Sequence, residues 1–482
     1  MGPLEIILLV ILGLILVLVS VVLIRTMMFK PIKEEKIIKE ELTFDRKKCV
    51  KTLQEMIKCR TISYTDKSKE DENEFIKFEK VLKDYFPNVH KVCEFTKVSD
   101  RSLLYRWVGK NSSKATVLMS HYDVVEVNEE GWDKDPFGGV IENNVLWGRG
   151  TLDTKGTLNA VLNAAENLIL DGFTPENDIY FAFGGNEEVN GDGAVQIVEY
   201  FKENKINVTL VIDEGGAVVE KVFPGVRERC AVIGIGEKGV LNLKMEVKTN
   251  GGHSSTPSPK GAVYKLSKAC VDIENKPFKA NLSIPTKEMF NTLGRHSTFV
   301  YRMIFANLWL FRGVLDLICK KSGGELNALM RTTCALTQME GSKQINVLPP
   351  VASVSMNLRL MSGETMNSAQ KYITQVVDNE DIEITRYWGI NPTDISEINC
   401  HEWNIVKKAI RSTWDHTIVT PYLMLAGSDA RHYNGFCNHV YRFSAMHLSK
   451  EERATIHGHN ERIPVDTIEK TVEFYIHVMK NC

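Results

Sequence analysis

The stretch Ile179-Tyr180-Phe181-Ala182-Phe183-Gly184-Gly185-Asn186-Glu187-Glu188 places two adjacent carboxylates directly after an apolar strand. Because successive side chains of an extended chain point in opposite directions, one carboxylate can face a metal ion while the other faces a substrate. A pair of glutamates taken alone more often begins a solvated loop, since charged residues are mostly exposed. The interpretation of Glu187 and Glu188 therefore depends on the chain around them.

Strands and helices alternate on both sides of this stretch. The spacing of apolar residues predicts helices over residues 72–85, 158–170 and 194–201 and strands over residues 103–108, 115–120, 179–183 and 208–212. This alternation predicts an α/β fold in which a mostly parallel sheet is covered by helices. Sheets of this kind place their functional sites at the carboxyl ends of the strands.

The pattern changes near residue 236. Strands are predicted over residues 240–247, 331–338, 351–360 and 382–386, and helices over residues 259–273 and 364–376. The order βαββαβ predicts a small antiparallel sheet with two helices on one face. The first pattern returns after residue 391, with helices over residues 403–413 and 465–479 and a strand over residues 440–443. We therefore expect one domain, residues 45–236 and 391–482, to be interrupted by an inserted α+β domain, residues 237–390.

A strongly apolar run, residues 299–318, lies within the insertion and resembles a membrane span in length. Arg302 and Arg312 interrupt it, and charged side chains are costly inside a bilayer. We expect a core helix or a lid helix here.

Length and composition limit the classes of function. The chain has 482 residues, more than the ~250–300 residues at which single hydrophobic cores stop growing, so two or more domains are expected. A net charge of −2 provides no basic surface for nucleic acid. The ten cysteines show no C-x-x-C spacing, so neither a zinc finger nor a thioredoxin-type motif is present.

The N-terminal segment, residues 4–24, is apolar except for Glu5 and a few small residues. It is about as long as the hydrocarbon layer of a bilayer requires. A cleaved signal peptide is the alternative, but the basic start and the small-x-small cleavage site of signal peptides are missing. We expect a membrane anchor, or a secreted protein if the segment is cleaved.

Two signals disagree about the side of the membrane on which the body lies. Basic residues follow the apolar segment at Arg25, Lys30, Lys33 and Lys36. The positive-inside tendency would keep the body in the cytosol. Glycosylation sequons begin at Asn111, Asn207 and Asn281. They favour a glycoprotein of the secretory pathway or cell surface, which is the interpretation we prefer.

Candidate metal ligands follow the predicted strands of the first domain. His121 and Asp123 lie two residues apart on one face, an arrangement in which a carboxylate fixes the tautomer of a ligating imidazole. A lone histidine at a strand end is more often only hydrogen-bonded. Further candidates are Asp153, Glu187, Glu188, Asp213, Glu214 and His457. Mixed nitrogen and oxygen ligands without a thiolate are typical of catalytic zinc and two-zinc sites.

These motifs occur in a fixed order along residues 45–480. The order is His121-x-Asp-Val-Val, Trp132, Asp135-Pro136-Phe137, Gly148-Arg-Gly-x-x-Asp-x-Lys155, Glu187-Glu188, Asp213-Glu214-Gly215-Gly216, Gly251-Gly252-His253-Ser254-Ser255 and His457-x-x-Asn-Glu461. The set resembles the aminoacylase, carboxypeptidase S and succinyl-diaminopimelate desuccinylase family of two-zinc metallopeptidases. The Asp-Glu-Gly-Gly form and the N-terminal segment are most similar to carboxypeptidase S and the N-fatty-acyl-amino-acid synthase/hydrolase. Glu126 replaces a proline that often ends the first motif, which affects the rigidity of that loop and no ligand.

The resemblance implies a role for each matching position. Two zinc ions per subunit would be held by His121, Asp153, Glu188, Asp213 and His457. Asp153 would bridge the ions, and Asp123 would orient His121. Glu187 would be the general base that deprotonates the water between the ions, a step that a metal ion and a nearby carboxylate favour together. His457 matches the motif better than His459, because of its spacing to Asn460-Glu461.

The resemblance also implies that the insertion is a lid and dimerisation domain. In this family the histidine that matches His253 polarises the scissile carbonyl, commonly across a dimer interface, so a homodimer is implied. The implied substrate-binding positions are Asn346, Arg359, Gly427 and Arg431. Asn346 and Arg431 would hold the free carboxylate of the substrate, for which a guanidinium fork is well shaped. Arg359 is equally compatible with an exposed strand arginine.

The expected function is zinc-dependent hydrolysis of an amide next to a free amino-acid carboxylate. N-acyl amino acids, in hydrolysis or in reverse synthesis, are the first substrate class, and peptide C-termini are the alternative. The apolar run at residues 299–318 favours a fatty acyl chain, although such runs more often build a core. A membrane-tethered binding ectodomain without catalysis is a third hypothesis, since fold does not imply function. The complete ligand set with Glu187 speaks against it.

Overall fold

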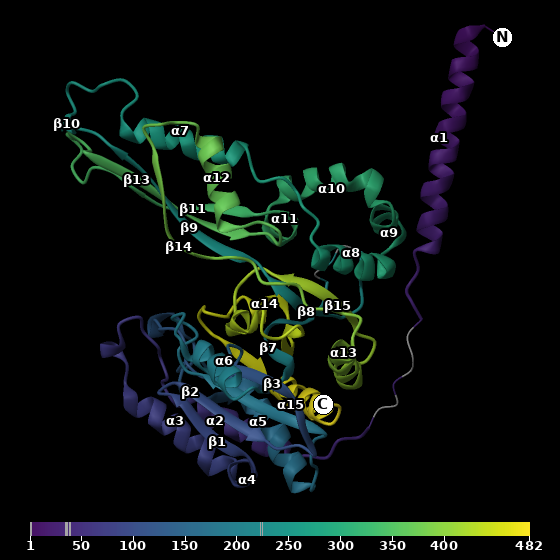
Figure 1. Ribbon diagram of the computed structural model, residues 1–482, viewed down its shortest axis with the longest axis vertical. Helices are drawn as coiled ribbons and strands as arrows, with labels where there is room; N and C mark the ends of the chain where they lie inside the picture. Colours follow the sequence, from purple (N-terminus) through teal and green to yellow (C-terminus); the bar gives the residue numbers. More distant parts are fainter. Residues whose placement is uncertain (1, 34–36, 38–39, 222, 224) are drawn as a thin grey trace.

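Two sheets of different size organise the chain, and one long N-terminal helix stands apart from both (Figure 1). The computed structural model describes residues 2–33, 37, 40–221, 223 and 225–482. Lys36, one of the basic residues after the apolar segment, lies outside the described residues.

The larger sheet has eight strands in the order β1-β2-β6-β3-β7-β16-β8-β15. Its strands are β1 (Glu94–Ser99), β2 (Ser102–Trp107), β3 (Asn111–His121), β6 (Asn177–Gly184), β7 (Val208–Val219), β8 (Cys230–Glu237), β15 (Ile418–Met424) and β16 (Val440–His447). β3 pairs in parallel with β6 and β7, and β7 pairs in parallel with β16. The β1–β2, β2–β6 and β8–β16 pairs are antiparallel. The α/β class is confirmed, with a parallel centre inside a mixed sheet.

Helices cover this sheet. They are α2 (Arg46–Ile57), α3 (Glu72–Tyr85), α4 (Pro87–Val92), α5 (Lys155–Leu170), α6 (Gly193–Glu203), α13 (His401–Thr413) and α15 (Val465–Met479). α5 packs against α2, α15 and β3, and it is buried almost throughout because apolar and small side chains surround it on all sides. The helix after the Asp153 turn is therefore fixed by the core.

The smaller sheet has four antiparallel strands in the order β11-β13-β9-β14. Its elements are β9 (Gly239–Lys248), α7 (Ala262–Asn275), β11 (Thr333–Glu340), β13 (Val351–Leu360), α12 (Met366–Val377) and β14 (Glu383–Ile390). This is the predicted βαββαβ order. The sheet and its two helices have a hydrophobic core separate from that of the larger domain. A two-residue ladder, β10 (Gly252–His253) with β12 (Val347–Leu348), lies near the far end of this domain (Figure 1).

The apolar run expected as a single core or lid helix is two helices, α9 (Phe299–Ala306) and α10 (Leu308–Ser322). Asn307 separates them, and its side-chain amide donates a hydrogen bond to the carbonyl of Met303. The outer face of α10 is not part of a core, contrary to the expectation of a core helix, because Trp309 is 57% and Leu317 67% exposed. α8 (Ile284–His296) and α11 (Gly324–Met330) complete this group.

The N-terminal helix α1 (Pro3–Met28) is long and apolar enough to cross a membrane. It extends away from both domains (Figure 1), and its buried residues are Val22 and Thr26 near its C-terminal end. The expected anchor segment is thus a single helix that meets the rest of the chain only at one end.

Candidate metal centre

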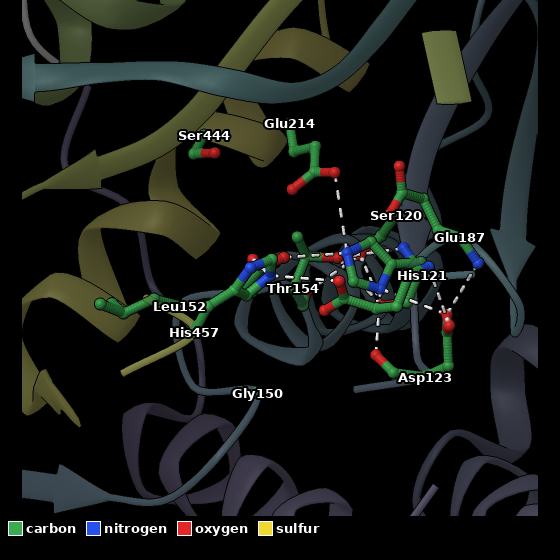
Figure 2. Close-up of polar contacts among 12 residues, drawn as sticks. Ser120, His121, Asp123, Gly150, Leu152, Thr154, Glu187, Glu214, Ser444 and His457 are labelled. Carbon is green, nitrogen blue, oxygen red and sulfur yellow. Dashed lines mark hydrogen bonds and ion pairs between the residues drawn. The ribbon is translucent and has the colours of Figure 1, made fainter. Parts of the chain in front are cut away.

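Two histidines and several carboxylates converge at the carboxyl ends of the central strands (Figure 2). His121 is the last residue of β3, Glu187 and Glu188 lie in the turn after β6, and Glu214 lies within β7. His457 comes from the loop between α14 (Lys450–Arg453) and β17 (Arg462–Pro464). The sheet therefore gathers residues that are far apart in the sequence.

The first group of potential ligands consists of His121, Asp153 and Glu214. His121 Nε2 lies 2.9 Å from Asp153 Oδ1 and 3.6 Å from Glu214 Oε1. His121 and Asp153 are predicted ligands that the structure brings together. Glu214, the neighbour of the predicted ligand Asp213, completes this group.

The second group consists of Asp153, Glu188 and His457. His457 Nε2 lies 3.0 Å from Asp153 Oδ2 and 3.1 Å from Glu188 Oε2. Asp153 thus presents one oxygen to each group, as a carboxylate that bridges two ions does. The structure therefore brings the predicted ligands Glu188 and His457 together with Asp153.

Asp123 connects His121 to the paired glutamates. Its Oδ1 lies 3.3 Å from His121 Nδ1, and the backbone carbonyl of Asp123 lies 3.0 Å from the same nitrogen. The backbone N–H groups of Glu187 and Glu188 donate to its two carboxylate oxygens, at 3.2 and 3.1 Å. Ser63 Oγ donates to Asp123 Oδ2 at 2.7 Å. Because the side chain is fully buried, Asp123 fixes both the imidazole and the turn that carries the base.

Glu461 holds the turn that presents Asp153. Its fully buried carboxylate accepts hydrogen bonds from the backbone N–H groups of Gly150, Leu152 and Asp153, and from the guanidinium of Arg149 at 2.7 Å. Strand β17 begins at the next residue and pairs with β5 (Val145–Trp147), which leads into this turn. The sequence motif contained Glu461, but no property of the sequence indicated that it acts on Asp153.

The protonation equilibria reflect crowded negative charge. Burial raises the pKa of Glu187 to about 8, and the neighbouring carboxylates add to this shift. Burial and the charge of Asp153 raise the pKa of Glu214 well above its usual range. Hydrogen bonds to Asp153 and Glu188 raise the pKa of His457 to about 10. A bound cation would relieve this repulsion and restore the ionised carboxylates.

Asp213 belongs to neither ligand group, although it lines the same small pocket as His121, Glu187 and Glu214. Its Oδ2 accepts the backbone N–H of Ala430 at 2.9 Å, so Asp213 anchors the turn that carries Asp429 and Arg431. Asp429, which sequence reasoning did not single out, lines one small pocket with His121, Glu187 and Glu214. Burial raises the pKa of Asp429 to about 7.

The predicted substrate-binding residues and His253 lie in three places. Arg431 donates to Asn190 Oδ1 at 3.1 Å, and its guanidinium lies over Gly427, where a Cβ atom would approach it to 3.2 Å. Arg359 is half-buried on β13, opposite Val240 of β9. His253 and Asn346 are exposed at the β10–β12 ladder, where Ser254 N donates to the carbonyl of Asn346. Among the described residues no contact joins these two to the metal groups.

The donor set suits a pair of metal ions. Each group offers one imidazole and two carboxylates, one of them shared, with ligand atoms within 4.8 Å of one another. Nitrogen and oxygen donors without thiolate, with positions left open, are typical of catalytic sites. Ions placed there would act as Lewis acids beside the carboxylate of Glu187.

Comparison with known proteins agrees with this chemistry. The family described as Peptidase family M20/M25/M40 matches residues 117–481. A probable carboxypeptidase S-like 2 of Dictyostelium discoideum is 35% identical over 88% of this chain and 82% of its own length. The N-fatty-acyl-amino acid synthase/hydrolase PM20D1.1 of Danio rerio is 32% identical over 97% of this chain and 93% of its own length.

Solved structures share the fold. An M20 family metallo-carboxypeptidase, Sso-CP2 of Sulfolobus solfataricus, has a TM-score of 0.63 at 19% identity, over 90% of this chain and 98% of its own. Human carnosine dipeptidase 1 also has a TM-score of 0.63, at 15% identity, over 90% of this chain and 96% of its own.

Proposed function

Because the chain belongs to peptidase family M20/M25/M40 and is a metallohydrolase, we propose that it hydrolyses the amide bond of N-acyl amino acids with a free carboxylate. The reverse reaction, amide synthesis, uses the same groups. Two zinc ions per subunit would be held by His121 with Glu214 and by His457 with Glu188, and Asp153 would be shared between them.

The single observation that carries this proposal is the position of Asp153. Its two oxygens lie 2.9 Å from His121 and 3.0 Å from His457, which are the two imidazoles of the site. Asp153 is only partly exposed, and two further carboxylates, Glu214 and Glu188, lie within 4.8 Å of the ligand atoms of the two imidazoles. Metal ions balance such crowded negative charge. The shared carboxylate therefore supports a two-metal centre.

Glu187 is the group that moves the proton. Zinc bound at this centre would polarise the scissile carbonyl and lower the pKa of the attacking water. The Glu187 carboxylate would accept a proton from that water and return it to the leaving amine nitrogen. Asp123 positions the backbone N–H of Glu187, so the base and the His121 ligand keep a fixed relation.

Arg431 would hold the substrate carboxylate, with Gly427 leaving the space that its guanidinium occupies. His253 and Asn346 are exposed at the β10–β12 ladder, and β10 lies at the end of the smaller domain far from the larger sheet (Figure 1). Their exposure supports a homodimer in which each smaller domain, acting as a lid, brings these two residues to the partner's centre. In that arrangement His253 would polarise the carbonyl, and Arg359 would line the substrate path at the base of the lid.

An apolar cavity supports a fatty acyl substrate. A cavity of about 310 Å³ lies between α8, α11 and the strands β7, β8 and β15, a volume near the lower end of the ~300–1,000 Å³ of ligand pockets. Its apolar lining includes Val219, Phe223, Leu293, Leu326 and Leu329. Val219 lies five residues after Glu214 on the same strand, about 16 Å along it at ~3.3 Å per residue. The carboxypeptidase S-like relatives favour the second candidate, hydrolysis at peptide C-termini.

The proposed location is the secretory pathway or cell surface, with α1 as an anchor. Asn111, Asn207 and Asn281 are all exposed, as glycan acceptors must be. A body on the luminal or extracellular side would carry these glycans.

The test is a comparison of substrates with the purified full chain. Hydrolysis of a long-chain N-acyl amino acid and of a dipeptide would be measured for the wild type, with and without a zinc chelator, and for Glu187→Gln. We expect chelator-sensitive cleavage of the N-acyl amino acid, and loss of turnover in Glu187→Gln with unchanged metal content. An unchanged rate in Glu187→Gln would refute the mechanism, and faster cleavage of the dipeptide would favour the second candidate.

A further inference from the structure

The end of α1 is packed into the junction between α9 and α10. The side-chain amide of Asn307 lies 3.3 Å from both the carbonyl of Val22 and Thr26 Oγ1. The guanidinium of Arg25 donates to the carbonyl of Ala306 at 3.2 and 3.3 Å. Thr26 and Asn307 are completely buried in this contact. The α9–α10 pair is therefore fixed to the last turn of α1.

This attachment determines the depth of α9 and α10 relative to a membrane. A helix rises 1.5 Å per residue, so the apolar segment of residues 4–24 spans about 30 Å, the thickness of the hydrocarbon layer. Val22 then lies within one helical turn of the layer's edge. Because Asn307 touches Val22, the junction of α9 and α10 lies at the surface of the same bilayer.

The outer face of α10 is apolar. Leu310, Val314 and Leu317, spaced like residues on one side of a helix, are all exposed, and Trp309 and Ile318 flank them. The inward face is apolar as well, since Cys319 is buried and Leu308 and Leu315 pack against the core. A helix on the surface of a soluble domain normally turns polar side chains outward.

The neighbouring features fit lipid better than water. α9 adds Phe299 and Val300, both more than half exposed, to the same group of helices (Figure 1). Lys320 and Lys321 follow at the end of α10. Lys320 pairs with Asp316 at 3.1 Å, and Lys321 is exposed; basic side chains next to a bilayer are attracted to lipid phosphates. Exposed apolar patches of this kind mark protein or membrane contacts, and amphipathic helices with basic ends lie in membrane interfaces.

We propose that the outer face of α9 and α10 is a second membrane contact, inserted into the interface of the phospholipid bilayer that α1 crosses. The proposal rests on the proposed role of α1 as a retained anchor. The contact fixes the body against the membrane surface. α11 follows α10 directly and contributes Leu326 and Leu329 to the apolar cavity.

Tryptophan quenching tests the contact in the full chain. Wild-type protein would be reconstituted into phosphatidylcholine vesicles that contain lipids brominated near the headgroup end of the acyl chains. Trp309→Phe removes the reporter on α10, and Trp388→Phe is the matched control, because Trp388 is also exposed but lies on β14 of the smaller domain. Both changes are conservative and lie at the surface, so folding is preserved.

The expected result is bromine quenching in the wild type that is lost in Trp309→Phe and kept in Trp388→Phe. Equal quenching in the wild type and Trp309→Phe would overturn the proposal. Intact mass separates this failure from that of the anchor: a chain that retains α1 and floats with vesicles, yet shows no Trp309 quenching, keeps the anchor and loses the second contact. A chain cleaved after α1 would overturn both. Absent Trp309 quenching, together with chain-to-chain crosslinking of a Val314→Cys variant that the wild type does not show, would overturn the proposal and assign the face to a second copy.

Discussion

The substitution Glu461→Gln tests whether one buried carboxylate holds the bridging ligand in place. Glu461 is fully buried and accepts hydrogen bonds from Gly150, Leu152 and Asp153 and from Arg149, which is 2% exposed. Glutamine has the same shape but no charge. Its amide NH₂ group is a donor, and it would face the N–H groups of the turn, which are donors as well. The turn that carries Asp153 should therefore loosen.

The magnitude follows from the loss of a buried pair. Removing one partner of a buried ion pair typically destabilises a protein by about 3–5 kcal/mol. Arg149 keeps a second acceptor, the carbonyl of Gly458 at 2.9 Å, and glutamine keeps one oxygen, so we expect the smaller effect of about 2–4 kcal/mol. At roughly 2 °C per kcal/mol for a domain of this size, Tm should fall by about 4–8 °C. Metal affinity should fall about 10–100-fold, as it does when groups that orient a ligand are changed.

Thermal unfolding and metal titration of the purified full chain measure both effects. Glu451→Gln is the matched control, because Glu451 is exposed on the same segment and its loss should change neither quantity. Wild-type Tm and metal affinity in Glu461→Gln would refute the role given to Glu461. A lower Tm with unchanged metal affinity would restrict Glu461 to stability alone.

Three further predictions concern the ligands, the cavity and the buried Lys238 between β8 and β9. Glu214→Gln should lower the metal content toward one ion per chain while Asp213→Asn keeps two, because Glu214 belongs to a ligand group and Asp213 does not; equal losses would contradict the assignment. Leu329→Trp should fill the apolar cavity and raise KM for long-chain N-acyl amino acids but not for N-acetyl ones, and a chain-length profile that does not change would place the acyl chain elsewhere. Burial lowers the pKa of Lys238 to about 7. Its charged form therefore destabilises the folded protein below pH 7, and the wild type gains stability, roughly 3–5 kcal/mol, as the pH rises from about 7 to 10.5. Lys238→Met should lack this gain in Tm measurements, and Tm-against-pH curves that run parallel in the two proteins would contradict the prediction.

The parallel centre of the larger sheet could be predicted because its strands are short apolar runs between helices with clear spacing. β8 and β15 could not be predicted in this way, because glycine or proline interrupts their apolar runs. β8 contains Gly234 and Gly236, where a Cβ atom would approach Arg442 Cβ to 3.1 Å and Ile395 Cδ1 to 2.6 Å. β15 contains Pro421, which is tolerated because β15 is an edge strand. Both features depend on neighbours that the local sequence does not reveal.

The ligand at Asp213-Glu214 shows a second limit. Side chains alternate along a strand, so the sequence can state that one acid faces the metal but not which one. The choice follows from the irregular pairing of β7 with β16, whose register shifts between Arg442 and Phe443. The apolar run of α9 and α10 shows a third limit, since apolar residues that face lipid have the same composition as residues that face a core.

The most direct test of the two-metal centre is the metal content of the purified full chain and of Asp153→Asn. Because Asp153 presents one oxygen to each ligand group, the wild type should hold two zinc ions per chain, and Asp153→Asn should lose both together with its activity. One ion per chain in the wild type, or two ions retained in Asp153→Asn, would contradict a centre built on a shared carboxylate.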